Sequence, residues 1–113
     1  MKYGPGRIEL TEEERAAAKQ ALCDNLVTLR KNLFLSQTEF GNRTGISRIR
    51  LSLIECGKYE MTWSQFTSML LVFMTNRSTC HIILKNKLFS ERLWLYLQGK
   101  RDGEEPDTSF KIL

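Results

Sequence analysis

Residues 35–57, reading LSQTEFGNRTGISRIRLSLIECG, constrain the fold more than any other part of the chain. Ser36 and Ser47 are each placed to begin a helix, because a serine oxygen accepts hydrogen bonds from the free N–H groups of a first turn. The residue three positions after Ser36 is a glutamate, which completes a capping box. Gly45 and Gly57 stand where each helix has to stop, since glycine tolerates a positive φ. The segment therefore predicts two short helices joined by a tight turn, the helix-turn-helix arrangement typical of DNA-binding proteins.

The composition limits the class of protein further. A length of 113 residues and a hydrophobic fraction of 42% fit one domain with a modest core. The net charge of +4 is compatible with a polyanionic partner but does not establish one. Cys23, Cys56 and Cys80 are widely spaced, which argues against a disulfide framework or a zinc site and favours the cytoplasm. No apolar run approaches the roughly 20 residues of a membrane span, so we expect no membrane association.

The N-terminal part is predicted to contain one long helix. Thr11 is followed three residues later by a glutamate, and this second capping box begins a helix that should run to about Lys31. Its core-facing stripe consists of Leu22, Leu26, Leu29 and Leu33. Residues 1–10 should form a flexible arm, and residues 11–75 the DNA-binding domain.

The C-terminal part is predicted to add further helices. Thr62 should cap a helix whose apolar residues Trp63, Phe66, Met69, Leu70 and Phe73 close the core. Residues 76–79 are interpreted as a turn, and the apolar sequence beyond them as one or two helices, with Ser90 capping the second; HIIL is alternatively a short strand. Residues 99–113 should form a flexible tail.

Residues 76–98 are thus a C-terminal helical extension with two alternative roles. Its apolar side chains complete the core by packing on the long first helix, or form a two-fold interface between two copies, and both roles can hold for different residues. The candidate dimer residues are Ile82, Ile83, Leu88, Trp94 and Leu97.

The helix predicted after Ser47 has two distinct faces. Leu51 and Ile54 should point into the core, and the outer face should carry Arg48, Ile49, Ser52 and Leu53. An arginine there can bind guanine O6 and N7 or a phosphate, and aliphatic side chains can contact thymine methyl groups. The alternatives for Ile49 and Leu53 are contact with another protein surface or simple exposure.

Other polar residues of the segment are candidates for phosphate contacts and for a structural ion pair. The phosphate candidates, each with a solvated or packed side chain as the alternative, are Ser36, Gln37, Arg43, Ser47, Arg50, Lys58 and Tyr59. Arg30 and Glu55 are expected to form a partly buried ion pair that locks the first helix to the helix after Ser47.

The segment LRKNLFLSQTEFGNRTGISRIRLSLIECGKYEMTWSQF resembles the phage-repressor-like (Cro/C1, or Xre) helix-turn-helix family. The resemblance rests on Leu29-Arg30, Leu35-Ser36-Gln37, Glu39-Phe40, Gly45-Ile46-Ser47, Ser52, Ile54-Glu55 and Gly57. It implies an all-α, compact, lambda-repressor-like helical bundle, here with a long N-terminal helix and extra C-terminal helices. It also implies base reading by Arg48, Ile49 and Leu53, and pairing of Arg30 with Glu55. Gly41 and Met61 depart from the family, which usually has alanine and proline there.

The pattern and the resemblance together imply a sequence-specific transcriptional regulator of a bacterium or phage. It would act as a repressor, bound as a homodimer to a near-palindromic operator in double-stranded DNA. The alternatives are the antitoxin of a toxin–antitoxin pair, whose apolar C-terminal helices hold a toxin protein, and a helix-turn-helix-derived interaction module without DNA binding. The sequence contains no catalytic motif and a single histidine, His81, so we expect no enzyme activity, metal or cofactor.

Overall fold

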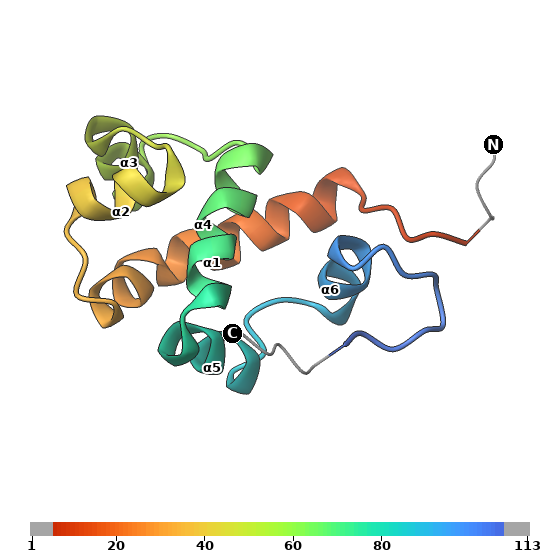
Figure 1. Ribbon diagram of the computed structural model, residues 1–113. Helices are drawn as coiled ribbons and strands as arrows, with labels where there is room; N and C mark the ends of the chain where they lie inside the picture. The colour runs from red at the N-terminus through yellow and green to blue at the C-terminus, as the bar shows by residue number, and fades with distance from the viewer. Residues whose placement is uncertain (1–5, 108–113) are drawn as a thin grey trace.

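The structure is a computed structural model that describes residues 6–107. It is an all-α bundle, as predicted, with no strand in this range (Figure 1). The helices are α1 (Glu12–Asn32), α2 (Gln37–Thr44), α3 (Arg48–Glu55), α4 (Trp63–Thr75), α5 (Arg77–Lys85) and α6 (Glu91–Leu97). None of these helices has the length and apolar character needed to span a bilayer.

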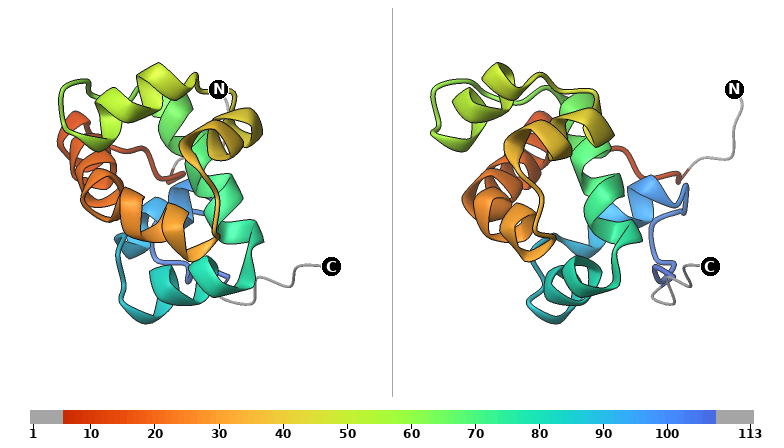
Figure 2. Two further views of the ribbon diagram at one scale, coloured as in Figure 1. Left: turned by 90° about the vertical axis from the view of Figure 1, so that its left-hand side faces the viewer. Right: turned by 60° about the vertical axis from the view of Figure 1, so that its left-hand side comes forward.

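The helix boundaries follow the predicted caps. Thr11, Ser36 and Thr62 each form a complete capping box, and Ser47 and Ser90 accept hydrogen bonds from N–H groups of the first turns of α3 and α6. Helix α1 is the longest element, and α3, α4 and α5 pack against it. Helices α2 and α3 lie together at one end of the bundle, away from α6 (Figures 1 and 2). This end therefore carries the two helices predicted to bind DNA.

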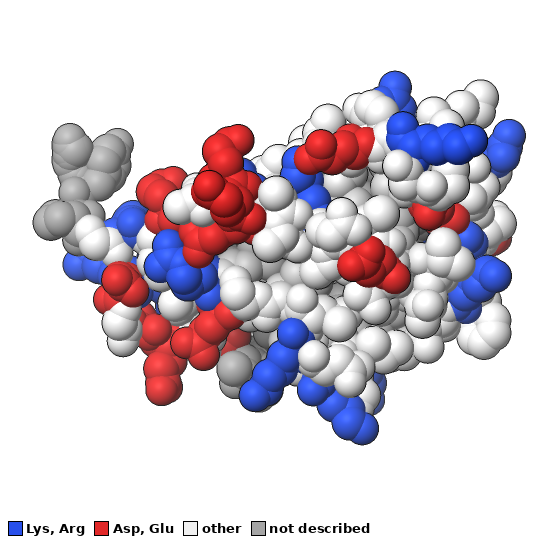
Figure 3. All heavy atoms as spheres, turned by 180° about the vertical axis from the view of Figure 1, so that it is seen from behind, with Lys and Arg blue, Asp and Glu red and all other residues white. Residues whose placement is uncertain are grey.

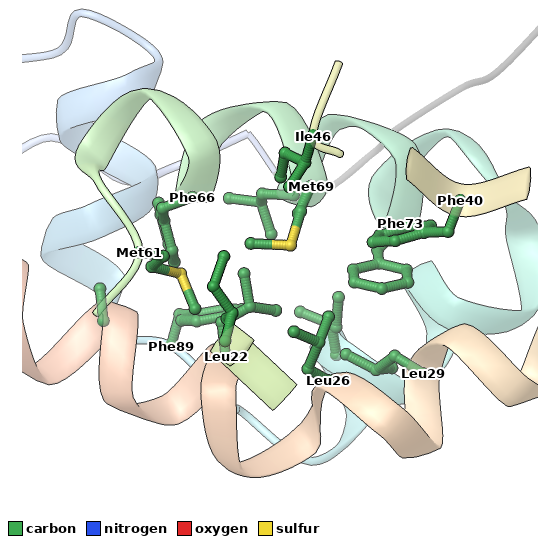
Figure 4. Close-up of a cluster of buried hydrophobic side chains, with 14 of the residues drawn as sticks. Leu22, Leu26, Leu29, Phe40, Ile46, Met61, Phe66, Met69, Phe73 and Phe89 are labelled. Carbon is green, nitrogen blue, oxygen red and sulfur yellow. The ribbon is translucent and has the colours of Figure 1, made fainter. Parts of the chain in front are cut away.

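The core lies between α1 and α4 and extends to both ends of the bundle (Figure 4). The rings of Phe40 and Phe73 stack with centroids 5.0 Å apart, which joins α2 to α4. Met61, in the loop before α4, is 3% exposed and belongs to the same core. Met61 therefore contributes apolar packing to this loop.

The structure corrects the interpretation of residues 76–79 as a turn. Helix α5 begins at Arg77, so the break between α4 and α5 is confined to Asn76, with φ −105° and ψ 128°. The buried Thr79 hydroxyl donates to the Phe73 carbonyl at 2.5 Å and so fastens the first turn of α5 to the end of α4. The strand alternative for HIIL is also wrong, because these residues lie within α5.

The two ends of the described chain pair with each other, a contact that the sequence did not predict. Arg7 and Arg101 form an isolated antiparallel bridge, and the Ile8 amide donates to the Lys100 carbonyl at 3.2 Å. The Gln98 amide group exchanges two hydrogen bonds with the backbone of Asp107. The contacts between the N-terminal segment and residues 99–101 join positions about ninety residues apart, so local composition gave no sign of them. The predictions for residues 1–5 and 108–113 lie outside the described residues.

Polar contacts fasten α6 to the start of α1. The Arg92 guanidinium binds the Glu14 carboxylate at 2.5 Å and the Glu9 carbonyl at 3.0 Å. This arginine and the Thr11 capping contact hold the pKa of Glu14 below its usual value. The Arg15 guanidinium lies over the rings of Trp63 and Tyr96. Helix α6 is thereby anchored to the same body as α1 and α4.

The C-terminal helices contribute to the core, which is one of the two roles predicted for them. Ile83 is 1% exposed and inaccessible to a second chain. Ile82, Leu88 and Trp94 are half-buried against the core. Leu97 is 41% exposed, so of the five candidates only Ile83 is excluded from an interface by its burial. Ile83, Phe89 and Leu93 belong to the core, so part of the apolar excess of this segment is used there.

Phe34 is held in a costly backbone conformation. It follows the C-cap of α1 with φ 58°, and its side chain is 92% exposed. Since glycine adopts this conformation freely and no packing is lost, we expect Phe34→Gly to raise the free energy of unfolding by roughly 0.5–1 kcal/mol. Urea denaturation tests this. Lys31→Gly, within the helical last turn of α1, is the matched control and should lower stability by about 1 kcal/mol. A loss of stability in Phe34→Gly would contradict the prediction.

Candidate nucleic-acid interface

The α2–α3 turn brings two helices into close contact. Gly45 ends α2 with φ 76°, and its amide donates to the Gly41 carbonyl at 2.8 Å. The Ile46 amide reaches the same carbonyl at 3.2 Å, and the Ile46 side chain is buried. A Cβ atom at Gly41 would clash with the Ile46 carbonyl oxygen. Glycine at position 41 is therefore required by this turn as it stands.

Helix α3 separates inward and outward residues as predicted. Leu51 and Ile54 are fully buried, whereas Arg48 is exposed. Ile49 is 67% exposed and Leu53 is 36% exposed, so both aliphatic side chains meet solvent. Ser52 lies half-buried on the same side. The outer face of α3, defined as Arg48, Ile49, Ser52 and Leu53, thus combines one cation, one hydroxyl and two aliphatic groups.

Arg30 and Glu55 form the predicted ion pair. The Arg30 Nε and Nη2 atoms donate to the two Glu55 oxygens at 2.7 and 3.0 Å, a bidentate arrangement with both side chains below 10% exposure. Arg30 Nη1 also donates to the Leu35 carbonyl at 2.9 Å, and Gln37 Nε2 donates to Glu55 at 2.9 Å. One network therefore fixes the end of α3 to α1, to the α1–α2 loop and to the start of α2.

The predicted phosphate residues have local partners on this end of the molecule. The Ser36 and Ser47 hydroxyls serve as helix caps, and Gln37 donates to Glu55. The Arg43 guanidinium donates to the Glu39 carbonyl at 2.8 Å. These contacts orient side chains that remain at the surface or half-buried.

The other three phosphate candidates are Arg50 on α3 and Lys58 and Tyr59 on the loop that follows it. The Arg50 guanidinium stacks on Tyr59, 3.6 Å from the ring centroid. Lys58 is exposed on the same loop, directly after Gly57. The stack orients Arg50 while leaving N–H groups at the edge of its guanidinium plane. Arg50 and Tyr59 are nine positions apart on a helix and a loop, so no local periodicity indicated their contact.

Charge is unevenly distributed over the molecule. Figure 3 shows Asp and Glu gathered toward the end formed by the start of α1 and residues 99–107, whereas Lys and Arg predominate at the end formed by α2 and α3. Glu55, within the basic end, is neutralised by Arg30. The pKa of Glu39 is lowered by its capping hydrogen bonds with Ser36. The α2–α3 end is consequently the one suited to a polyanion.

A shallow groove runs between α1 and the loop that joins α3 to α4. It has a volume of about 410 Å³ and is lined by Lys19, Cys23, Tyr59 and Glu60 among others. Lys19 and Glu60 bind each other across it at 2.8 Å. Burial, with a smaller contribution from Asp24, raises the pKa of the Cys23 thiol, so this thiol is a poorer nucleophile than a free one. Within residues 6–107, no three His, Cys, Asp or Glu side chains are grouped as a metal site.

Comparison of the chain with protein-family models, with curated proteins and with solved structures finds no match.

Proposed function

We propose that this protein is a sequence-specific DNA-binding regulator of the phage-repressor-like helix-turn-helix type, acting in the cytoplasm as a repressor. In this proposal α3 enters the major groove, and its outer face contacts base edges. The N-terminal end of α2 and the cations Arg43, Arg50 and Lys58 approach the phosphate backbone.

The observation that carries the proposal is the outer face of α3, held by the network around Arg30 and Glu55. The network restrains both ends of the α2–α3 unit through hydrogen bonds of 2.7–3.0 Å. Because the outer face of α3 is held rigidly, less conformational entropy is lost when it binds a partner. Arg48 supplies a guanidinium for a guanine, and Ile49 and Leu53 supply apolar groups that fit thymine methyl groups.

The exposed aliphatic groups also favour a second candidate function. Ile49 and Leu53 lie four residues apart on α3, and such a pair suits contact with an apolar protein surface. In that case the helix-turn-helix would be an interaction module without DNA binding, with Ile49 and Leu53 as its contact residues.

A salt titration separates the two candidates. Binding of a labelled random duplex is measured by fluorescence anisotropy at increasing salt concentrations, and bound sites are then selected from the random library. DNA binding through several phosphate contacts predicts that log K falls linearly with log salt, with a slope of about −0.9 per contact. No binding at low salt would contradict the regulator and leave the interaction module.

The role of Arg48 gives a position-specific prediction. Arg48→Ala should remove discrimination at one base pair of the selected site, at a cost of about 1–3 kcal/mol, and leave the other positions unchanged. Site selection with the variant measures this. Lys58→Ala is the control, since loss of a phosphate contact should weaken binding to all sequences equally and reduce the salt slope by about one. An unchanged selected site in Arg48→Ala would contradict base reading by this residue.

A further inference from the structure

Helix α5 carries charged residues of one sign only. It contains Arg77 and Lys85 with His81 between them, and Lys87 follows two residues after its end. Each of the other helices in the described range carries both signs, apart from α4, which carries no charge. Residues 61–90 contain no Asp or Glu at all. A second concentration of positive charge therefore lies outside the α2–α3 end.

The basic side chains of α5 share its outer face. Arg77, His81 and Lys85 recur at intervals of four and are all exposed, whereas the buried residues of α5 lie on its other side. Lys87 is exposed as well. We call Arg77, His81, Lys85 and Lys87 the α5 patch. Along the lower edge of Figure 3, where α5 lies, Lys and Arg are visible, and the Asp and Glu side chains lie to the left of them or above.

The charge of the α5 patch is not neutralised within residues 6–107. The ion pairs of this range use other cations, namely Lys19, Arg30, Arg92 and Lys100. Arg77 also occupies the first turn of α5, where the helix dipole favours an anion and where α1, α2 and α6 have glutamates. Asn76, the N-cap of α5, makes no side-chain capping hydrogen bond. The patch thus combines cations without carboxylate partners and a helix N-terminus without an acidic residue.

The surroundings of the α5 patch favour a nucleic acid over a lipid surface or a protein. None of the exposed residues between positions 76 and 87 is apolar. Helices that bind a bilayer surface insert apolar side chains, and protein interfaces have an apolar core. Ion pairs at a protein surface contribute little on their own. Cations that contact the phosphates of a duplex, in contrast, release condensed counterions and gain affinity without apolar contacts.

We propose that the α5 patch binds the phosphate backbone of a DNA duplex without reading its sequence. Arg77, His81 and Lys85 lie about 6 Å apart along the helix axis, because four residues rise by about 6 Å. The row is therefore about 12 Å long, and phosphates follow each other at about 3.4 Å along each strand of a duplex. The patch can accordingly contact several phosphates at once.

The α5 patch and α3 lie on opposite sides of the bundle. Helices α2 and α3 lie above α1 and α5 lies below it in Figures 1 and 2. A straight duplex that contacts the outer face of α3 therefore does not reach the α5 patch. In combination with the proposed function, on which this consequence rests, one molecule would hold two segments of DNA. Operator binding by α3 requires no cation on α5, so the patch adds a second contact surface.

Fluorescence anisotropy of a labelled random duplex tests the proposal on the full chain. The α3-side variant Arg43→Gln/Arg48→Gln/Arg50→Gln/Lys58→Gln removes the cations proposed to serve α3. It should still bind the duplex, and log K should fall against log salt with a slope of about −0.9 for each of the three Lys and Arg side chains of the patch. This slope corresponds to a loss of about 40-fold between about 50 and 200 mM salt. Adding the patch variant Arg77→Gln/Lys85→Gln/Lys87→Gln should abolish the remaining binding.

The matched control separates the patch from the net charge. Arg7→Gln/Lys100→Gln/Arg101→Gln, made in the same α3-side background, removes the same charge at the end of the molecule where Asp and Glu gather. This control should retain most of the binding. Circular dichroism checks that all variants are folded.

Several results would overturn the proposal. One is an α3-side variant that does not bind duplexes, and another is an equal loss of binding in the patch variant and in the control. Sedimentation with phosphatidylserine vesicles tests a lipid surface, and patch-dependent binding that is tighter than to the duplex would identify this partner instead. Sedimentation velocity without DNA tests a second copy: self-association that the patch variant abolishes would place the acidic end of another molecule on α5.

The failure of this inference and that of the proposed function give different results. If the patch variant abolishes binding and the α3-side variant binds as well as the wild type, the α5 patch binds DNA and the role proposed for α3 is contradicted. If sequence-selective binding is unchanged in the patch variant and absent from the α3-side variant, the proposed function stands and the α5 patch is contradicted.

Discussion

Arg30→Ala should lower the free energy of unfolding by about 3–5 kcal/mol, the largest effect that we expect from a single polar side chain in this protein. The substitution leaves the Glu55 carboxylate, which is 7% exposed, without its bidentate partner. It also removes the donor to the Leu35 carbonyl. Thermal unfolding followed by circular dichroism measures the change, and the midpoint should fall by roughly 10–20 °C.

A double-mutant cycle distinguishes a buried pair from two independent contributions. The double variant Arg30→Ala/Glu55→Ala leaves no unpaired charge, so its cost should be well below the sum of the two single variants. The control is Lys19→Ala, which breaks an ion pair whose partner Glu60 is 75% exposed and should cost at most about 1 kcal/mol. Additive single effects, or an Arg30→Ala variant as stable as the Lys19→Ala variant, would contradict the assigned role of the pair.

The features that could be predicted from the sequence are those encoded locally. A capping residue and its partner are three positions apart, so Thr11, Ser36 and Thr62 were identifiable without knowledge of the fold. The inner and outer residues of α3 likewise follow from helical periodicity alone. The pair of Arg30 and Glu55, 25 positions apart, was predictable because the family resemblance places them together.

The features that were missed depend on contacts distant in sequence. Residues 76–79 were predicted to form a turn because they are mostly polar. The hydrogen bond from the Thr79 hydroxyl to the Phe73 carbonyl, which fastens α5 to α4, cannot be recognised from the local sequence. The pairing of Ile8 with Lys100 is invisible for the same reason. For Ile83, periodicity identified an apolar face of the helix, but only the packing shows that this face meets the core and is closed to a partner.

Gly41→Ala should lower the free energy of unfolding by about 1–3 kcal/mol. This is the opposite of its effect in an isolated helix, which alanine stabilises relative to glycine by roughly 1 kcal/mol. The added Cβ atom would meet the Ile46 carbonyl oxygen, which belongs to the backbone and cannot turn aside as a flexible side chain does. Relief requires the α2–α3 turn to open. Because the turn sets the position of α3 relative to α2, the variant should also bind a selected duplex more weakly.

The control for this substitution is Asn42→Ala, at the next position of the same helix. Asn42 is exposed, so alanine at this position raises the helix propensity without a clash. The free energy of unfolding of the Asn42→Ala variant should therefore be unchanged or slightly higher. Urea denaturation of both variants gives the comparison. A Gly41→Ala protein that is more stable than the wild type would contradict the prediction. It would mean that the gain in helix propensity outweighs the clash and that the α2–α3 turn accommodates a methyl group. The alanine usual at this position in the phage-repressor-like family would then be tolerated here as well. A destabilised variant would instead show that the close approach of position 41 to the Ile46 carbonyl oxygen requires glycine, and that the position of α3 relative to α2 depends on this residue.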